Sequence, residues 1–168
     1  MAAPLFIAWN ANTSGLSGPP AATATSATSG TVKTILQVKA GAQKFRIVEW
    51  GYGFDAAPAS PVRVELVETG VFAEITQITA VTRYNDATGP ASSAVVSAVR
   101  ATGFNSTDEG IITASRLFAY NYDTSLYFKQ QFPLGREPEV NASMALRIRA
   151  TPTSAAAVNM WCYVIWEE

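Results

Sequence analysis

The chain has 168 residues, contains no histidine, and carries 12 Lys and Arg against 13 Asp and Glu. Without imidazole, a Ser/His/Asp triad, a Cys/His pair and a His-ligated zinc site are excluded; Cys162, the single cysteine, excludes a disulfide within the chain. The near-neutral charge argues against duplex nucleic acid as a partner, and no apolar run approaches the ~20 residues of a membrane-spanning helix. We therefore expect one folded domain with no nucleic-acid partner, no membrane partner and no cofactor.

Residues 1–31 are rich in Ala, Thr, Ser, Gly and Pro, and the first charged residue of the chain is Lys33. This composition is typical of a flexible tail, because it cannot bury enough apolar surface to fold alone. An apolar group near its start, Leu5, Phe6, Ile7 and Trp9, favours a different interpretation, since such side chains can anchor the segment. We expect an extended arm over residues 1–31 that docks on a neighbouring subunit through these four residues, followed by a folded domain over residues 32–168.

From residue 32 onward the apolar residues recur with a period of two, which is typical of β-strands. The predicted apolar faces are Val32, Thr34, Leu36 and Val38; Val48, Trp50, Tyr52 and Phe54; Val62, Val64 and Leu66; and Met144, Leu146 and Ile148. The last segment, 156–168, is apolar on both faces, so we expect a central strand that is covered on both sides. Short strands separated by turn sequences, with no capped amphipathic helix, predict an all-β antiparallel sandwich with a jelly-roll-like topology.

The candidate catalytic residues have simpler structural interpretations. Asp108 and Glu109 follow FNST, where acidic residues commonly make turns. Cys162 lies in an apolar strand with no histidine to activate it, which indicates a small core residue. Arg147 and Arg149 alternate on one strand face, which either contacts solvent or meets an acidic partner. We expect no enzyme and no metal site.

Aromatic residues are concentrated in LFAYNYDTSLYFKQQF, residues 117–132. Alternation along Phe118, Tyr120 and Tyr122 fits either a core face or an exposed strip that serves a protein interface or the stacking of sugar rings. Adjacent Tyr127 and Phe128 point to opposite faces of any strand, so at least one leaves the core unless both faces are covered. Tyr120, Tyr122, Tyr127 and Phe128 are therefore candidate interface residues.

Three stretches carry a family resemblance: TVKTILQVKAGAQKFRIVEWGYGFD at 31–55, VRVELVET at 62–69, and the terminal VIWEE. They resemble small β-sandwich proteins that are encoded with the structural genes of tailed bacteriophages, several of which decorate or cement the capsid. The resemblance covers most of residues 31–168 in layout and rests on hydrophobic strand patterns. It implies no catalytic residue.

The resemblance implies a non-enzymatic virion protein that is made in the host cytoplasm and stabilises the capsid from its surface. The expected partners are the major capsid protein and neighbouring copies of the chain, with a trimer favoured, because many weak contacts add up in a symmetric coat. The alternative is a carbohydrate-binding β-sandwich of a phage tail or fibre, in which Tyr120, Tyr122 and Tyr127 stack on sugar rings.

Overall fold

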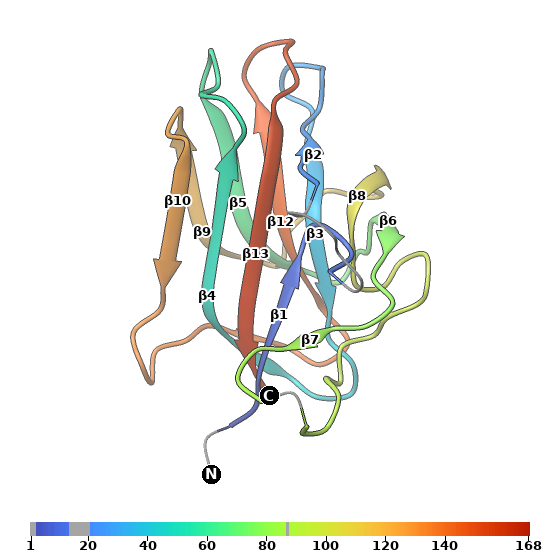
Figure 1. The fold of residues 1–168 in the computed structure, drawn as a ribbon. Helices are drawn as coiled ribbons and strands as arrows, with labels where there is room; N and C mark the ends of the chain where they lie inside the picture. Colours follow the sequence, from blue (N-terminus) through green and yellow to red (C-terminus); the bar gives the residue numbers. More distant parts are fainter. Residues whose placement is uncertain (1–2, 14–20, 87) are drawn as a thin grey trace.

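The computed structural model describes residues 3–13, 21–86 and 88–168, and the regular structure of these residues is entirely β-strand. Two antiparallel sheets pack against each other as a β-sandwich (Figure 1). The predicted fold class is confirmed, while the jelly-roll topology stays a prediction. Within the described ranges, no helix is long and apolar enough to cross a membrane.

The two sheets differ in strand order. Sheet A has the order β10 (Tyr127–Gln131), β4 (Phe45–Phe54), β13 (Asn159–Glu167), β1 (Leu5–Trp9) and β7 (Thr82–Arg83), with β11 (Glu139–Val140) beside β4 and β2 (Thr23–Ala24) beside β13. Sheet B has the order β6 (Glu74–Gln77), β8 (Gly103–Asp108), β3 (Lys33–Lys39), β12 (Ala145–Pro152), β5 (Val62–Thr69) and β9 (Arg116–Asp123). Non-consecutive strands are therefore neighbours throughout both sheets.

The core lies between the sheets and largely follows the alternation that the sequence predicts. Val48 departs from its predicted face, because a register shift between Ile47 and Glu49 makes it an extra residue outside the core. Its inward side chains include Trp50, Tyr52 and Phe54 of β4, Val62, Val64 and Leu66 of β5, and Leu146 and Ile148 of β12. Burying these side chains stabilises the sandwich by roughly 1.5–3 kcal/mol for each large aliphatic or aromatic group. Residues between them in the sequence face outward, and these residues form the surfaces described below.

Strand β13 lies between β4 and β1, in the middle of sheet A, as its two apolar faces predict. Its inward side chains are the fully buried Met160, Cys162, Val164 and Trp166. The ring of Trp166 packs against Phe45 and Phe6, with centroid distances of 5.5 and 5.9 Å. On the outer face, Ile165 and Tyr163 are only 5% and 7% exposed. The strand is thus covered on both sides.

Residues 5–9 do not extend away from the domain, which corrects the predicted arm. They form β1, which pairs with β13 along its length and with β7 on its other edge. Phe6 is 1% exposed and lies in the core of its own chain, so its assignment to a partner is wrong. The backbone of β1 pairs with the edge of β13, and its inward side chains fill the core beside that strand. Residues 14–20 of the predicted arm lie outside the described residues.

A β-bulge in β3 changes which face its side chains occupy. Leu36 pairs with Ile148 and Thr34 with Arg149, so Ile35 is an extra residue between them. Ile35 and Leu36 both enter the core, whereas the Thr34 hydroxyl bonds to groups on the outer face. The prediction that Thr34 shares a face with Leu36 is therefore wrong, because a bulge shifts the period of two by one residue.

Replacing Phe6 by Ala should lower the free energy of unfolding by about 3–5 kcal/mol, because the change leaves a cavity beside Trp166. Urea denaturation followed by tryptophan fluorescence measures this loss. Ile7→Ala, on the half-buried outer face of the same strand, is the matched control and should cost less than half as much. Equal stability of Phe6→Ala and the wild type would contradict the placement of β1.

Candidate functional site

Among the described residues, aromatic side chains that point away from the core gather on two surfaces, which lie on opposite faces of the sandwich. The first, which we call the platform, is on the outer face of sheet A and consists of Trp9, Tyr127, Trp161 and Tyr163. The second, which we call the hollow, is on the outer face of sheet B and is lined by Ser29, Gly30, Arg63, Tyr120, Tyr122, Thr151, Pro152 and Thr153. Both surfaces are formed by residues that the strand alternation directs away from the core.

The platform is a continuous row of rings from β1, β13 and the edge strand β10, and it passes over β4, which contributes no ring. Trp9 of β1 packs on Tyr163 of β13 with a centroid distance of 4.8 Å and on Trp161 at 6.1 Å. Tyr127 of β10 continues the row, 5.6 Å from Trp161. Tyr127 is 52% exposed, Trp9 and Trp161 are half-buried, and Tyr163 lies beneath its neighbours. The rings hold one another in place and present one apolar surface.

Two glycines of β4 allow these rings to lie flat. Gly51 pairs with Tyr163, and Gly53 pairs with Trp161. A Cβ on Gly51 would lie 2.8 Å from Tyr163 Cε1, and one on Gly53 would lie 2.4 Å from Trp161 Cζ2. Each ring therefore lies where a side chain at Gly51 or Gly53 would otherwise be. In a strand, glycine often marks such a close approach.

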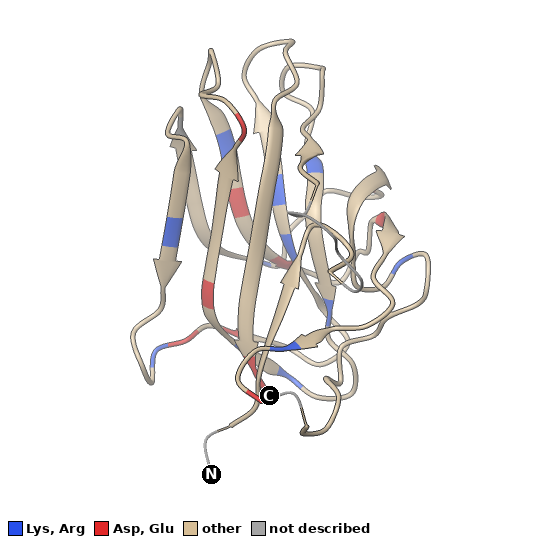
Figure 2. Ribbon diagram, viewed as in Figure 1, with Lys and Arg blue, Asp and Glu red and all other residues tan. Residues whose placement is uncertain are grey.

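One carboxylate on the same outer face anchors the platform. Glu49 of β4 accepts a hydrogen bond of 2.6 Å from the Tyr163 hydroxyl and pairs with Lys129 Nζ at 3.0 Å. Burial, together with this hydrogen bond, raises the pKa of Tyr163, so its hydroxyl stays protonated and fixed on Glu49. The rest of the central surface is nearly uncharged: β1 has no charged residue and β13 only its last, and Figure 2 shows both strands almost without colour.

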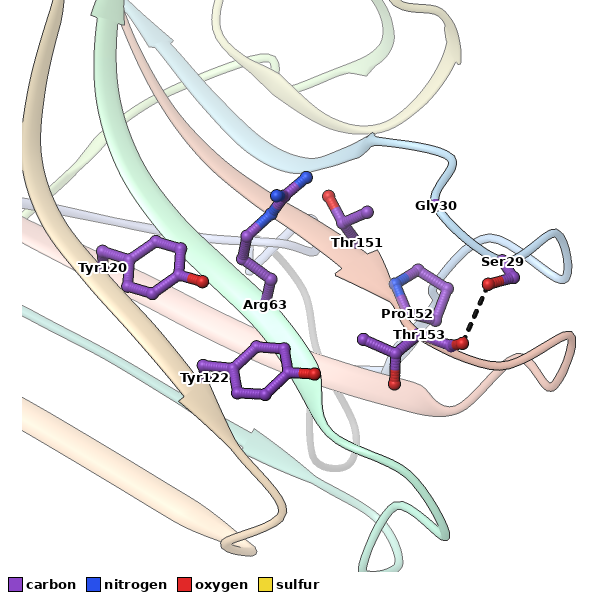
Figure 3. Close-up of a pocket in the computed structure, with 8 residues that line it drawn as sticks. All are labelled: Ser29, Gly30, Arg63, Tyr120, Tyr122, Thr151, Pro152 and Thr153. Carbon is purple, nitrogen blue, oxygen red and sulfur yellow. Dashed lines mark hydrogen bonds between the residues drawn. The ribbon is translucent and has the colours of Figure 1, made fainter.

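The hollow combines tyrosine rings with polar groups from neighbouring strands (Figure 3). Tyr122 of β9 pairs with Arg63 of β5, which in turn pairs with Thr151 of β12. Tyr120 lies two residues before Tyr122 on β9, opposite Glu65, and points to the same face. The loop before β3 closes the far side, where Ser29 Oγ donates a hydrogen bond of 2.8 Å to the Thr153 carbonyl.

An ion-pair network lies beside the hollow. Glu65, the cross-strand neighbour of Tyr120, accepts a hydrogen bond of 2.8 Å from Arg149 Nη2. Its other oxygen is 3.6 Å from Arg63 Nε. Arg149 also donates to the Ile112 carbonyl in the segment that leads to β9. Among the described residues, two guanidinium groups therefore share the one carboxylate of Glu65.

Arg147 and Arg149 were open to two interpretations, solvent or an acidic partner, and the structure places acidic partners within the same chain. Arg147 is fully buried and forms an ion pair with Glu109. Its Nε donates a hydrogen bond of 2.8 Å to Thr34 Oγ1. Burial lowers the pKa of Arg147, while the adjacent Glu109 opposes that shift. This outer face is thus covered, and Glu109 serves as a counter-ion.

The other candidate chemical groups also have structural roles. Asp108 accepts hydrogen bonds from Gly110 N at 2.9 Å and Arg100 Nη2 at 3.2 Å, and these contacts lower its pKa. Cys162 is fully buried, and burial raises the pKa of its thiol, which disfavours the reactive thiolate. Among the described residues, no group of three or more His, Cys, Asp or Glu side chains could hold a metal ion.

The structure separates the residues that the sequence analysis grouped. Leu5, Ile7 and Trp9 face outward on β1, and only Trp9 joins the platform, while Phe6 belongs to the core. Among the four candidate interface aromatics, Tyr120 and Tyr122 line the hollow and Tyr127 lies in the platform. Phe128 packs on Trp50 and Tyr52, so it points inward, opposite to Tyr127.

Sequence reasoning missed four functional candidates: Trp161 and Tyr163 in the platform, and Arg63 and Thr151 in the hollow. The alternation of the last strand already placed Trp161 and Tyr163 together on its outer face, so that signal was present. Arg63 and Thr151 meet only through cross-strand pairing of β5 with β12, which periodicity does not specify.

Comparison with protein-family models, with curated proteins and with solved structures finds no match for this chain.

Gly53→Ala should displace the Trp161 ring, because the added Cβ would overlap three atoms of the indole. We expect a changed near-ultraviolet circular dichroism spectrum and a loss of about 1–3 kcal/mol in stability. Gly70→Ala is the matched control, since its Cβ would meet only Met144 at 3.5 Å, an ordinary contact. A Gly53→Ala spectrum identical to that of the wild type would show that the ring does not need the glycine.

Glu109→Gln should lower the free energy of unfolding by about 3 kcal/mol at neutral pH, because it leaves the buried Arg147 without a counter-charge. Chemical denaturation measures the effect. Glu74→Gln removes the partner of Arg100 in an exposed ion pair and should cost less than about 1 kcal/mol. Similar losses of unfolding free energy in the two variants would mean that the burial of Arg147 does not make the loss of its counter-ion more costly.

Proposed function

We propose that this chain is a non-enzymatic structural protein of a tailed-phage virion, which binds the outside of the capsid through the platform and stabilises the shell. The observation that carries the proposal is the row of Trp9, Tyr163, Trp161 and Tyr127 on the outer face of sheet A. The strand patterns at 31–55 and 62–69 support it through their resemblance to phage head decoration proteins.

The platform has the properties of a protein-binding surface. Tryptophan and tyrosine are enriched among the residues that contribute most to protein interfaces, and the centres of such interfaces are depleted in charge. Trp9, Trp161 and Tyr163 are held by contacts with one another and by the glycines beneath them, so little side-chain freedom is lost on binding. Rigid aromatic surface is therefore available at a low entropic cost.

Attachment through the platform replaces attachment through an extended arm. Because Phe6 is part of the core, the outward residues of β1 act together with β13 and β10 as one rigid surface. The proposed partners are the major capsid protein and neighbouring copies of the chain, with a trimer favoured. Repeated display over a symmetric shell lets moderate single-site affinity give stable occupancy.

Trp161→Ala should weaken binding to bare capsids of the encoding phage by roughly tenfold or more, as expected for a central tryptophan. Co-sedimentation over a range of protein concentrations measures the affinity, and circular dichroism verifies the fold. Tyr120→Ala, on the opposite face, is the matched control and should bind as the wild type does. Wild-type affinity of Trp161→Ala would exclude the platform as the attachment surface, and no binding by the wild type would overturn the proposed function.

A further inference from the structure

The hollow on sheet B has features that the folding of the chain does not require. It is an open hollow of about 280 Å³ between β9, β5, β12 and the loop before β3 (Figure 3). This volume is close to the lower end of the roughly 300–1,000 Å³ typical of small-molecule sites. The hollow therefore suits a ligand of one or two rings.

Two polar atoms in the hollow have no hydrogen-bond partner within the described part of the chain. Thr151 is only 4% exposed, yet its Oγ1 has no hydrogen-bond partner there. Arg63 Nε also has no hydrogen bond, because Glu65 lies 3.6 Å away. Buried polar groups are nearly always satisfied by protein, water or a ligand, so a polar molecule in the hollow would satisfy both groups. Thr151 and Arg63 belong to adjacent strands and line the same hollow, so one ligand can reach both.

The tyrosines of the hollow are exposed in a way that suits ring stacking. Tyr120 and Tyr122 are 49% and 57% exposed and project from the edge strand β9 on one face. Figure 3 shows their rings on one side of the hollow, with Thr151 and Pro152 on the other and Arg63 between. Aromatic rings with one free face and a hydroxyl at the tip can stack on a sugar and bond to its hydroxyl groups.

The charge of the site selects among sugars. The lining contains the guanidinium of Arg63 and several hydroxyl donors, and none of its described residues is a carboxylate. Nearby, Glu65 is already bonded to Arg149, so it does not fully neutralise Arg63. A planar guanidinium can donate two parallel hydrogen bonds to a carboxylate. A neutral sugar has no carboxylate, so the site favours a sugar that carries one.

We infer that the hollow binds a carboxylated sugar, a uronic acid unit of a surface polysaccharide. The ring stacks on Tyr120 and Tyr122, its carboxylate accepts hydrogen bonds from Arg63, and Thr151 donates to a ring substituent. The platform and the hollow lie on opposite faces of the sandwich, so a chain attached to a capsid through sheet A presents the hollow outward. The sugar site itself does not depend on capsid binding.

The test is a titration of the ¹⁵N-labelled full chain with glucuronic acid, followed by two-dimensional NMR. We expect saturable shifts confined to residues around the hollow, including Gly30, Arg63 and Tyr122. Glucose tests the contribution of the carboxylate, and acetate tests that of the ring. Each should bind at least roughly tenfold more weakly than glucuronic acid. Equal affinity for glucose or for acetate, or shifts away from the hollow, would overturn the inference.

Three variants test the assignment of roles. Arg63→Gln should weaken glucuronic acid binding by roughly tenfold or more, and Tyr122→Ala and Thr151→Val by roughly threefold to tenfold. Thr151→Val retains the shape of the side chain and removes only the hydroxyl. Trp161→Ala, in the platform, is the control and should leave sugar affinity unchanged. Arg63→Gln should still co-sediment with capsids, so failure of the sugar site and failure of capsid attachment are distinguishable. Wild-type sugar affinity of Arg63→Gln would overturn the inference.

Discussion

The pairing of β13 with both β4 and β1 is the constraint on which the rest of the structure depends. This strand is apolar on both faces, so it can only lie where both are covered and both backbone edges are paired. Its inward Trp166 contacts Phe6 and Phe45, which fixes β1 as part of the domain. Its outward Trp161 and Tyr163 form the middle of the platform. One strand thus links the core to the proposed attachment surface.

The platform shows how an outward-facing aromatic surface can be rigid. Large side chains on a sheet normally stand away from it, with freedom at their tips. Here Gly51 and Gly53 remove the neighbouring side chains, and the rings of Tyr163 and Trp161 lie in that space. Glu49 of the adjacent strand then holds the Tyr163 hydroxyl by a hydrogen bond. The geometry that packs these rings is also what would make them effective in binding, because an ordered ring loses little entropy in a complex.

The few charges of the chain are largely engaged with one another. On sheet B, Arg147 pairs with Glu109 and Arg149 with Glu65, and both arginines are buried. Such pairs contribute little net stability, because desolvation offsets the attraction, but losing one partner is costly. Arg63 differs from these arginines, since it shares an already bonded carboxylate and borders an open hollow. Arg147 and Arg149 are therefore structural residues, whereas Arg63 is a candidate for binding a ligand.

The pattern of residues along the chain predicted the all-β sandwich, the inward faces of β5 and β12, the central place of β13, and the opposite directions of Tyr127 and Phe128. These features follow from a period of two, which depends only on the geometry of one strand. It did not determine that residues 5–9 form β1, because an isolated apolar pentapeptide can equally dock on another subunit.

Pairing and packing between distant strands set the bulge at Ile35, the cover over Arg147, and the two surfaces. A bulge arises from the pairing of β3 with β12, which shifts the register between Ile148 and Arg149. Tyr122, Arg63 and Thr151 meet because β9, β5 and β12 are neighbours, although they are far apart in the sequence. Periodicity specifies the face of each residue, whereas strand order specifies its neighbours across the sheet. A binding surface needs both, and the second is set by long-range packing.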